Sequence, residues 1–271
     1  MGTSKGYRAP TTPQWSQLKR EVGQATGDGA VSADDAAALL ANFVTRTGGA
    51  QSLTTHGLSG ISYGVSSSGG GGGGGRRGSG GGRAGGGQTS AAVRTGQRIS
   101  GFSAGISTGG LDGALQDAGL GHLVGRPAKE VFRGLVDYFC GDGSTLEEVD
   151  LREAMIDLRN ELIGDQQTYD EIKARLEQIL DPERLATTMK ELFGFYVFRQ
   201  FQRIFHEKLV QAHGIQKVKG MLGQIRTFVR ERVALITTRH NLRPSDWRGV
   251  KGRSEVQKIC QATYTAFERL R

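Results

Sequence analysis

The chain has 271 residues, of which 37% are hydrophobic and 43 are glycine, and its formal net charge is +8 at pH 7. This composition predicts one domain with a buried core and a separate flexible region. The sequence excludes a membrane-spanning protein, because no apolar run approaches the roughly 18 to 20 residues that cross a bilayer. No signal-peptide pattern follows Met1, so we expect a cytoplasmic protein.

Residues 1–13 combine small, polar and proline residues without any periodicity, which predicts a flexible N-terminal tail. Removal of Met1 would leave a free α-amine on Gly2. An α-amine has a pKa of about 7.7 to 8.0, against about 10.4 for lysine, so a sizeable fraction is uncharged and nucleophilic at neutral pH. Gly2 is therefore a candidate modification site, with plain disorder as the alternative interpretation.

Residues 14–49 are expected to form a short helical element. Trp15, Leu18 and Val22 would share one face of a first helix, and Ser32 is the predicted N-cap of a second helix that ends at two glycines. Helices this short are unstable alone, so they must dock on another part of the protein.

Residues 50–89 are predicted to be a glycine-rich linker. Ordering the seven consecutive glycines of residues 69–75 would cost the most backbone entropy of any residue type, with no side chain to bury in return. Arg76, Arg77 and Arg83 leave a nucleic-acid-binding segment as an alternative, although the tract lacks the aromatic residues that would stack on bases.

Residues 90–271 carry the pattern of an all-α helical bundle, with about five to seven helices and no strand alternation. The first helix, residues 90–115, has Gly101, Gly105 and Gly109 on one side, where a neighbouring backbone would approach closely. The following expected helices are 127–141, 144–162, 168–179, 181–213, 218–233 and 256–267.

Helix-start signals support most of these boundaries. Proline or capping residues mark four starts: Pro127, Ser144 with Glu147, Thr168 with Glu171, and Asp181 with Pro182. Gly214 is placed to end the helix of residues 181–213. Aromatic and aliphatic side chains crowd residues 191–210 of that helix, so we expect it to be the core helix and to pack on more than one side.

Charge is distributed unevenly along the chain. Residues 127–213 carry 11 basic and 17 acidic side chains, whereas residues 214–271 carry 13 and 4. The acidic and basic regions would complement each other within one fold, or the basic end would meet an acidic partner or nucleic acid. The candidate contacts at the basic end are Arg226, Arg230, Arg239, Arg243, Trp247, Arg248, Lys251 and Arg253. Trp247 would be a stacking or docking residue among these cations.

No motif for catalysis or for cofactor binding is visible. The acidic residues around Asp142 and Asp150 lack the order of a calcium loop, so we interpret them as helix caps and solvated faces. His206 and His213 are too far apart for the usual zinc pair on one helix. Cys140 and Cys260 lie in apolar patterns and are expected to be buried free thiols. We therefore expect a non-enzymatic protein without metal or cofactor.

Several segments nevertheless resemble a known family. They are the MGTS start, the glycine-rich region, residues 120–128 (LGHLVGRPA), residues 196–201 (YVFRQF) and the Asp246–Trp247 turn before the last helix. Together these segments resemble the QatB family, the B component of the bacterial Qat anti-phage defence system. The similarity is patchy through residues 1–90 and better from there to the end.

The resemblance implies a non-catalytic protein that works with an ATPase, a TatD-like nuclease and QatC, which is similar to the enzymes that build 7-cyano-7-deazaguanine. Such enzymes activate a deazaguanine carboxylate for attack by ammonia, and the Gly2 amine would take the place of ammonia. We therefore expect the helical body to bind QatC, and the glycine tract to leave the N-terminal region free to reach the active site. The rival hypothesis is a nucleic-acid-binding module that uses the basic C-terminal end.

Overall fold

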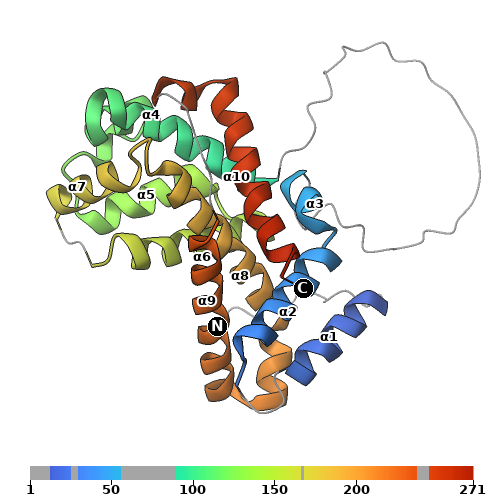
Figure 1. The fold of residues 1–271 in the computed structure, drawn as a ribbon. Coiled ribbons are helices and arrows are strands. Elements are labelled where there is room, and N and C mark those ends of the chain that lie inside the picture. The colour runs from blue at the N-terminus through green and yellow to red at the C-terminus, as the bar shows by residue number, and fades with distance from the viewer. Residues whose placement is uncertain (1–12, 26–29, 56–89, 166–167, 237–243, 271) are drawn as a thin grey trace, which may run out of the picture.

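A computed structural model describes residues 13–25, 30–55, 90–165, 168–236 and 244–270, and Figure 1 shows their arrangement. Within these ranges the chain is helical and contains no strand, which confirms the predicted all-α bundle. Residues 1–12 and 56–89, which hold most of the expected tail and linker, lie outside the described residues.

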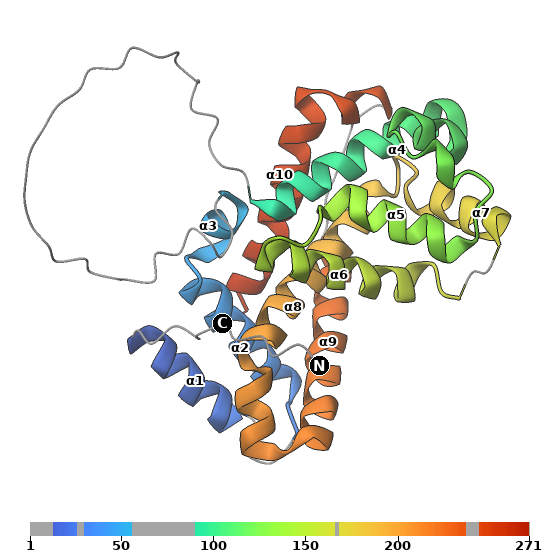
Figure 2. The ribbon, with the colours of Figure 1, turned by 180° about the vertical axis from the view of Figure 1, so that it is seen from behind.

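Ten α-helices and two short 3-10 helices make up the described parts of the chain. Their bounds are α1 (Pro13–Ala25), α2 (Ala33–Arg46), α3 (Gly49–Thr55), α4 (Ala91–Asp117), η2 (Gly121–Leu123), α5 (Ala128–Cys140), α6 (Leu146–Leu162), α7 (Tyr169–Ile179), α8 (Leu185–His213), α9 (Ile215–Ala234), η3 (Pro244–Arg248) and α10 (Val250–Glu268). Figures 1 and 2 place α4 to α7 on one side of α8 and α10, and α1 to α3 on the other.

Helix α8 is the core helix that the sequence predicted. It packs against α6, α9 and α10, and large side chains all around it, such as Phe193, Phe195 and Phe201, are at most 2% exposed. Fully burying one such side chain stabilises the fold by roughly 1.5 to 3 kcal/mol. The crowding of apolar residues in this part of the sequence therefore correctly predicted a helix that packs on several sides.

The predicted N-cap of this helix, Asp181, is wrong by three residues. Helix α8 begins at Leu185, with Arg184 as its N-cap. The Asp181 carboxylate instead accepts a hydrogen bond from the Glu183 amide at 2.9 Å, so Asp181 and Pro182 form a turn ahead of the helix. Aspartate often bonds the backbone two residues further on in this way.

The capping predictions differ in their accuracy. Ser32 and Thr168 both form complete capping boxes, with Asp35 and Glu171 respectively. The box predicted at Ser144 does not form, because the Thr145 hydroxyl caps α6 by accepting from the Glu148 amide, while the Glu148 carboxylate accepts from the Ser144 amide. Neighbouring serine and threonine residues offer the same capping chemistry, and the sequence alone does not choose between them.

The glycine stripe of α4 makes the predicted close contact at only one of its three positions. A Cβ atom at Gly105 would lie 3.3 Å from the Cα atom of Ala114, whereas one at Gly101 or Gly109 would meet nothing within 4 Å. A Cβ atom at Gly96, outside the stripe, would lie 2.6 Å from Val256 and 3.1 Å from Phe193. Close packing of α4 against α8 and α10 therefore occurs at Gly96. Further along α4, Gly110 has a φ of 64°, which breaks the helix and bends the chain.

Helices α1 to α3 dock on the C-terminal helices. The Phe43 ring of α2 packs edge-on against Phe201 of α8, with 5.8 Å between centroids. The Val31 amide donates to the Gln224 side chain at 2.8 Å, a contact between residues 193 positions apart. The N-terminal helices are thus part of the same core as α8 and α9.

Helix α3 was not predicted, and its sequence is too short and polar to indicate a helix. Leu53 is buried, and the α3 start is capped by Glu268 of α10, which accepts from the Ala50 amide at 3.3 Å. Helix α10 contacts both α3 and α4, so the chain leaves α3 and re-enters α4 beside the same helix (Figures 1 and 2).

Candidate functional site

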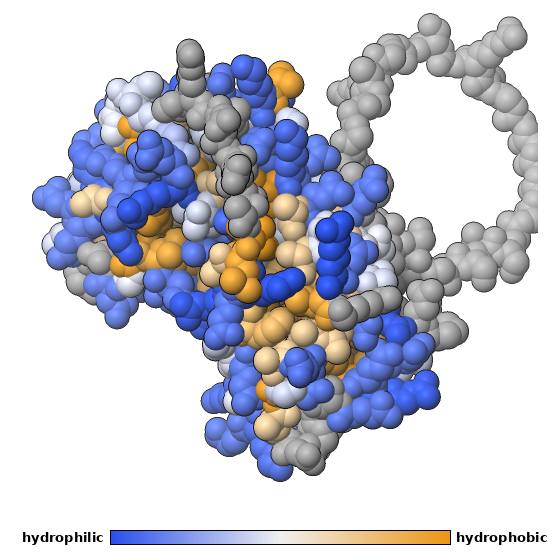
Figure 3. Space-filling view, viewed as in Figure 1, coloured by the Kyte–Doolittle hydropathy of each residue, from blue (hydrophilic) through white to orange (hydrophobic). Residues whose placement is uncertain are grey.

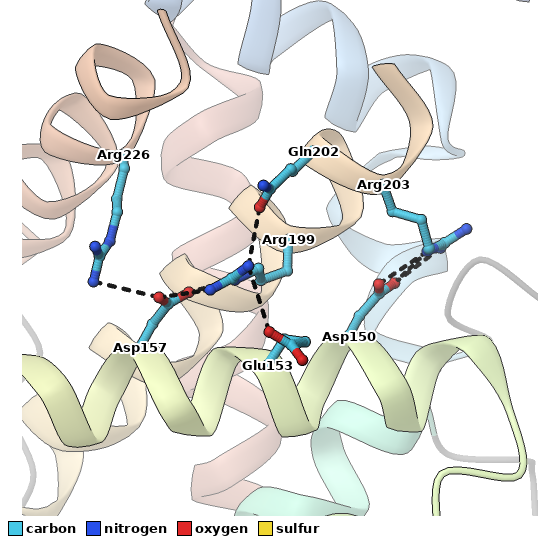
Figure 4. A network of polar contacts seen from close by, with 7 residues as sticks. All are labelled: Asp150, Glu153, Asp157, Arg199, Gln202, Arg203 and Arg226. Carbon is cyan, nitrogen blue, oxygen red and sulfur yellow. Dashed lines mark hydrogen bonds and ion pairs between the residues drawn. The ribbon is translucent and has the colours of Figure 1, made fainter. Parts of the chain in front are cut away.

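An ion-pair seam joins α6 to α8 and α9. We use this name for Asp150, Glu153 and Asp157 of α6 together with Arg199, Arg203 and Arg226 (Figure 4). Asp157 accepts from Arg199 Nη2 at 2.8 Å, and its Oδ1 atom lies 3.4 Å from Arg226 Nη2. Asp150 accepts from Arg203 Nε at 2.9 Å. Both aspartate side chains are only 4% exposed, so each carboxylate is desolvated and depends on its arginine partners.

The seam corrects our interpretation of the acidic residues. Asp150 was expected on a solvated face, but it points inward, and burial raises its pKa while the hydrogen bond from Arg203 opposes that rise. Apolar side chains of the same helix, Leu146, Val149 and Ile156, are 39–49% exposed. Helix α6 thus turns acidic residues toward the core and some apolar ones toward solvent, a reversal that a hydrophobicity pattern does not reveal.

Two of the predicted basic contact residues lie against this acidic helix. Arg226 pairs with Asp157, and its guanidinium lies 5.4 Å from the centroid of the Phe195 ring. Arg230 pairs with Glu161 near the end of α6. For these two arginines, the acidic and basic regions complement each other within the fold, which was one of the two alternatives for the uneven charge.

Trp247 is not a surface stacking residue, contrary to the prediction. It is 1% exposed and sits in η3, where its carbonyl accepts a hydrogen bond from the Ser100 hydroxyl at 3.1 Å. A Cβ atom at Gly252 would lie 2.3 Å from the same carbonyl, so η3 and α10 approach each other closely. The bulky indole therefore fills the space between α4 and α10, and nothing is left for a base to stack on.

The other described residues of the predicted set lie in η3 and the first turns of α10. Arg248 pairs with Asp117 of α4 at 2.9 Å. Lys251 is 74% exposed and lies 3.8 Å from Asp246, and Arg253 is exposed on the same first turns of α10. Gly2, Arg239 and Arg243 lie outside the described residues.

Within the described residues, no group of three or more histidine, cysteine, aspartate or glutamate side chains could hold a metal ion. Cys140 and Cys260 are buried, as predicted, and burial raises the pKa of each thiol to about 12, which suppresses the reactive thiolate. His206 is exposed on α8. Among the helices described, none combines the length and apolar character needed to cross a membrane.

Comparison with known proteins identifies the family of this chain. No curated protein and no solved structure matches the chain. A family model described as "Qat anti-phage system associated protein QatB" matches residues 80–267, which span α4 to α10 and the whole ion-pair seam. That match covers more than half of the sequence. The chain therefore belongs to the QatB family of the Qat anti-phage defence system.

Proposed function

We propose that this protein is a non-catalytic component of Qat defence that binds QatC, the QueC-like partner, and presents Gly2 for covalent modification by it. Family membership gives the protein a role in the Qat system, with other Qat components as its partners. QatC as the direct partner and Gly2 as the modified residue are the proposal.

The observation that carries the proposal is the anchoring of α1 on the helical body. Leu18 and Val22 are buried, and Glu21 pairs with Arg46 of α2 at 2.8 Å and accepts from Asn42 at 3.1 Å. The residues that precede Pro13 are therefore attached to a fixed point of the body. They are long enough to place Gly2 up to about 35 to 40 Å from that point when extended.

Because α1 is anchored, the segment that we expect to act as the tether of Gly2 changes. The glycine tract follows α1 to α3 in the chain, and these three helices are docked on α8, α9 and α10. The glycine tract therefore does not set the reach of Gly2. Only the short N-terminal tail does, so QatC must bind within about 40 Å of the start of α1.

The chemistry needs only an uncharged amine and an activated acyl group. The Gly2 nitrogen would attack the carbonyl carbon of a deazaguanine acyl-adenylate, AMP would leave, and the amine would lose one proton as the amide bond forms. An α-amine with a pKa of about 8 supplies enough of its neutral form at cellular pH for this step. QatC supplies ATP-dependent activation, and the protein described here supplies the nucleophile.

Intact-mass measurement of the full chain co-expressed with QatC tests the proposal. We expect a single added acyl group on the wild-type protein and on Gly2→Ala, which keeps a primary amine. Gly2→Pro offers only a hindered secondary amine and should remain unmodified. An unmodified wild-type protein from cells with active QatC would rule the proposal out.

The nucleic-acid alternative makes a different prediction. Arg226, Arg230 and Arg248 are engaged with acidic partners, and Trp247 is buried. We therefore expect a gel shift with purified protein to detect no more than weak, salt-sensitive binding without sequence preference. Tight, sequence-dependent binding would favour the alternative instead.

A further inference from the structure

A cavity of about 470 Å³ lies between the end of α6, the first half of α8 and the last turns of α9. The apolar part of its lining includes Leu162, Phe195 and Val233. Three carboxylates, those of Glu161, Glu191 and Glu231, also line it, together with the Arg230 guanidinium. The cavity therefore combines an apolar lining with negative charge.

Within the described residues, two cations lie close to these carboxylates. Arg230 pairs with Glu161. The Nζ atom of the neighbouring Lys190 is directed to the Ile236 carbonyl at 2.7 Å. The Oε2 atom of Glu191 is buried and has no hydrogen-bond partner among the described residues. Burial, together with the negative charge of Glu161, raises the pKa of Glu191, while the positive charges of Arg230 and Lys190 oppose this rise. A further cation beside Glu191 would lower its pKa in the same way.

The lining also restricts what kind of cation fits. Phe195 and the aliphatic walls would contact a hydrocarbon stem, while Glu191 would accept hydrogen bonds from an ammonium at its tip. A hydrated metal ion would leave the apolar walls without contacts. A lysine side chain has both the apolar stem and the three-donor ammonium.

A second hollow continues from the cavity along α9. It has a volume of about 450 Å³ and shares Thr227 and Glu231 with the cavity. Its lining includes Gly220 and Gly223, where an added Cβ atom would meet nothing within 4 Å. Figure 3 shows apolar surface in this area, between α9 and α2. The glycines leave room for a peptide main chain beside the helix.

From these features we propose that the cavity receives a lysine side chain from a partner protein, whose main chain lies along the hollow between α9 and α2. The lysine ammonium binds Glu191, and its stem packs on Phe195. This interaction does not depend on Gly2 or on its modification, so it adds a second contact between this protein and its partners.

An NMR titration of the full chain with the capped peptide acetyl-Ala-Gly-Lys-Gly-Ala-amide tests the proposal. We expect weak, saturable binding, with shifts confined to the end of α6, α8, α9 and the start of α2. Glu191→Gln should weaken binding at least about tenfold, because a charge-assisted hydrogen bond is lost. Glu153→Gln removes an equal charge at a half-exposed position of α6 that does not line the cavity, and it should leave the affinity unchanged.

Two further ligands test the proposal on the wild-type protein, so that the result does not depend on the folding of a variant. The same peptide with norleucine in place of lysine keeps the stem but lacks the ammonium, and it should not bind wild-type protein. Butylamine lacks the main chain and should bind much more weakly than the lysine peptide. Equal binding of the lysine and norleucine peptides would overturn the proposed ammonium site. Equal binding of butylamine and the peptide would overturn the assignment to a protein segment.

Discussion

Helix α8 meets its neighbours through two interfaces of opposite character. On the side of the N-terminal helices, Phe201 and Phe205 pack against Phe43 of α2, with ring centroids 5.8 and 6.4 Å apart. On the side of α6, the same helix contributes Arg199 and Arg203 to nearly buried aspartates. One helix thus holds one neighbour by apolar packing and another by paired charges.

The difference between the two interfaces determines which changes should destabilise each of them. Apolar packing stabilises in proportion to the area buried and is insensitive to salt. A buried ion pair contributes little net stability, but removing one partner leaves the other charge desolvated. The aromatic interface should therefore be strong and tolerant of salt, whereas the ion-pair seam should be sensitive to loss of a single charge.

The largest effect is expected at the aromatic interface. Phe201→Ala should lower the free energy of unfolding by about 3 to 5 kcal/mol, because the cavity left behind touches both Phe43 and Phe205. Urea denaturation followed by circular dichroism measures this change. Val250→Ala, at a residue 81% exposed, is the control and should change stability by less than about 0.5 kcal/mol. A similar cost for both variants would contradict the assigned core.

The next effect concerns the ion-pair seam. Asp157→Asn keeps the shape of the side chain but removes the charge that faces Arg199 and Arg226. We expect a loss of about 2 to 3 kcal/mol in urea denaturation, because two arginines lose their buried anion. Glu153, which is 50% exposed and also pairs with Arg199, gives the comparison. Glu153→Gln should cost less than about 1 kcal/mol, and a larger loss there than at Asp157 would refute the role of burial.

A cut in the glycine tract tests whether packing alone holds the N-terminal helices. We expect a protease site inserted within residues 69–75 to be cleaved while the two fragments elute together, even in molar salt. Phe43, at the centre of the interface, is 0% exposed, and Phe43→Ala should release the N-terminal fragment after the cut. Separation of the wild-type fragments by size exclusion would show that chain continuity, rather than docking, keeps α1 to α3 in place.

The smallest effect is a difference in the reactivity of two thiols. Because the pKa of each buried cysteine is raised to about 12, iodoacetamide at pH 8 should label neither in the folded chain. Cys260 interacts with Thr54 of α3, whereas Cys140 lies beside Thr95 of α4. Release of the N-terminal fragment should therefore accelerate labelling of Cys260 more than that of Cys140, as read by peptide mass spectrometry. Equal rates would mean that the two regions do not open separately.

Much of the fold was predictable because its signals act over one or two helical turns. Ser32 and Thr168 mark helix starts through their own hydroxyls, and Gly214 ends α8 because its φ of 78° suits glycine. The candidate site was less predictable. The cations and the tryptophan of the basic end were visible, but not the side each would face, because burial depends on helices far away in the chain.

By itself the sequence determined that this protein is all-helical, that residues 191–210 form its core and that its segments resemble the QatB family. Only the tertiary structure decided that Asp150 and Asp157 face inward, that Trp247 is buried and that α1 to α3 belong to the body. The physical reason is the range of the interactions. Helix formation and capping are local, whereas the partner of a charge or of an aromatic ring is chosen when distant helices pack.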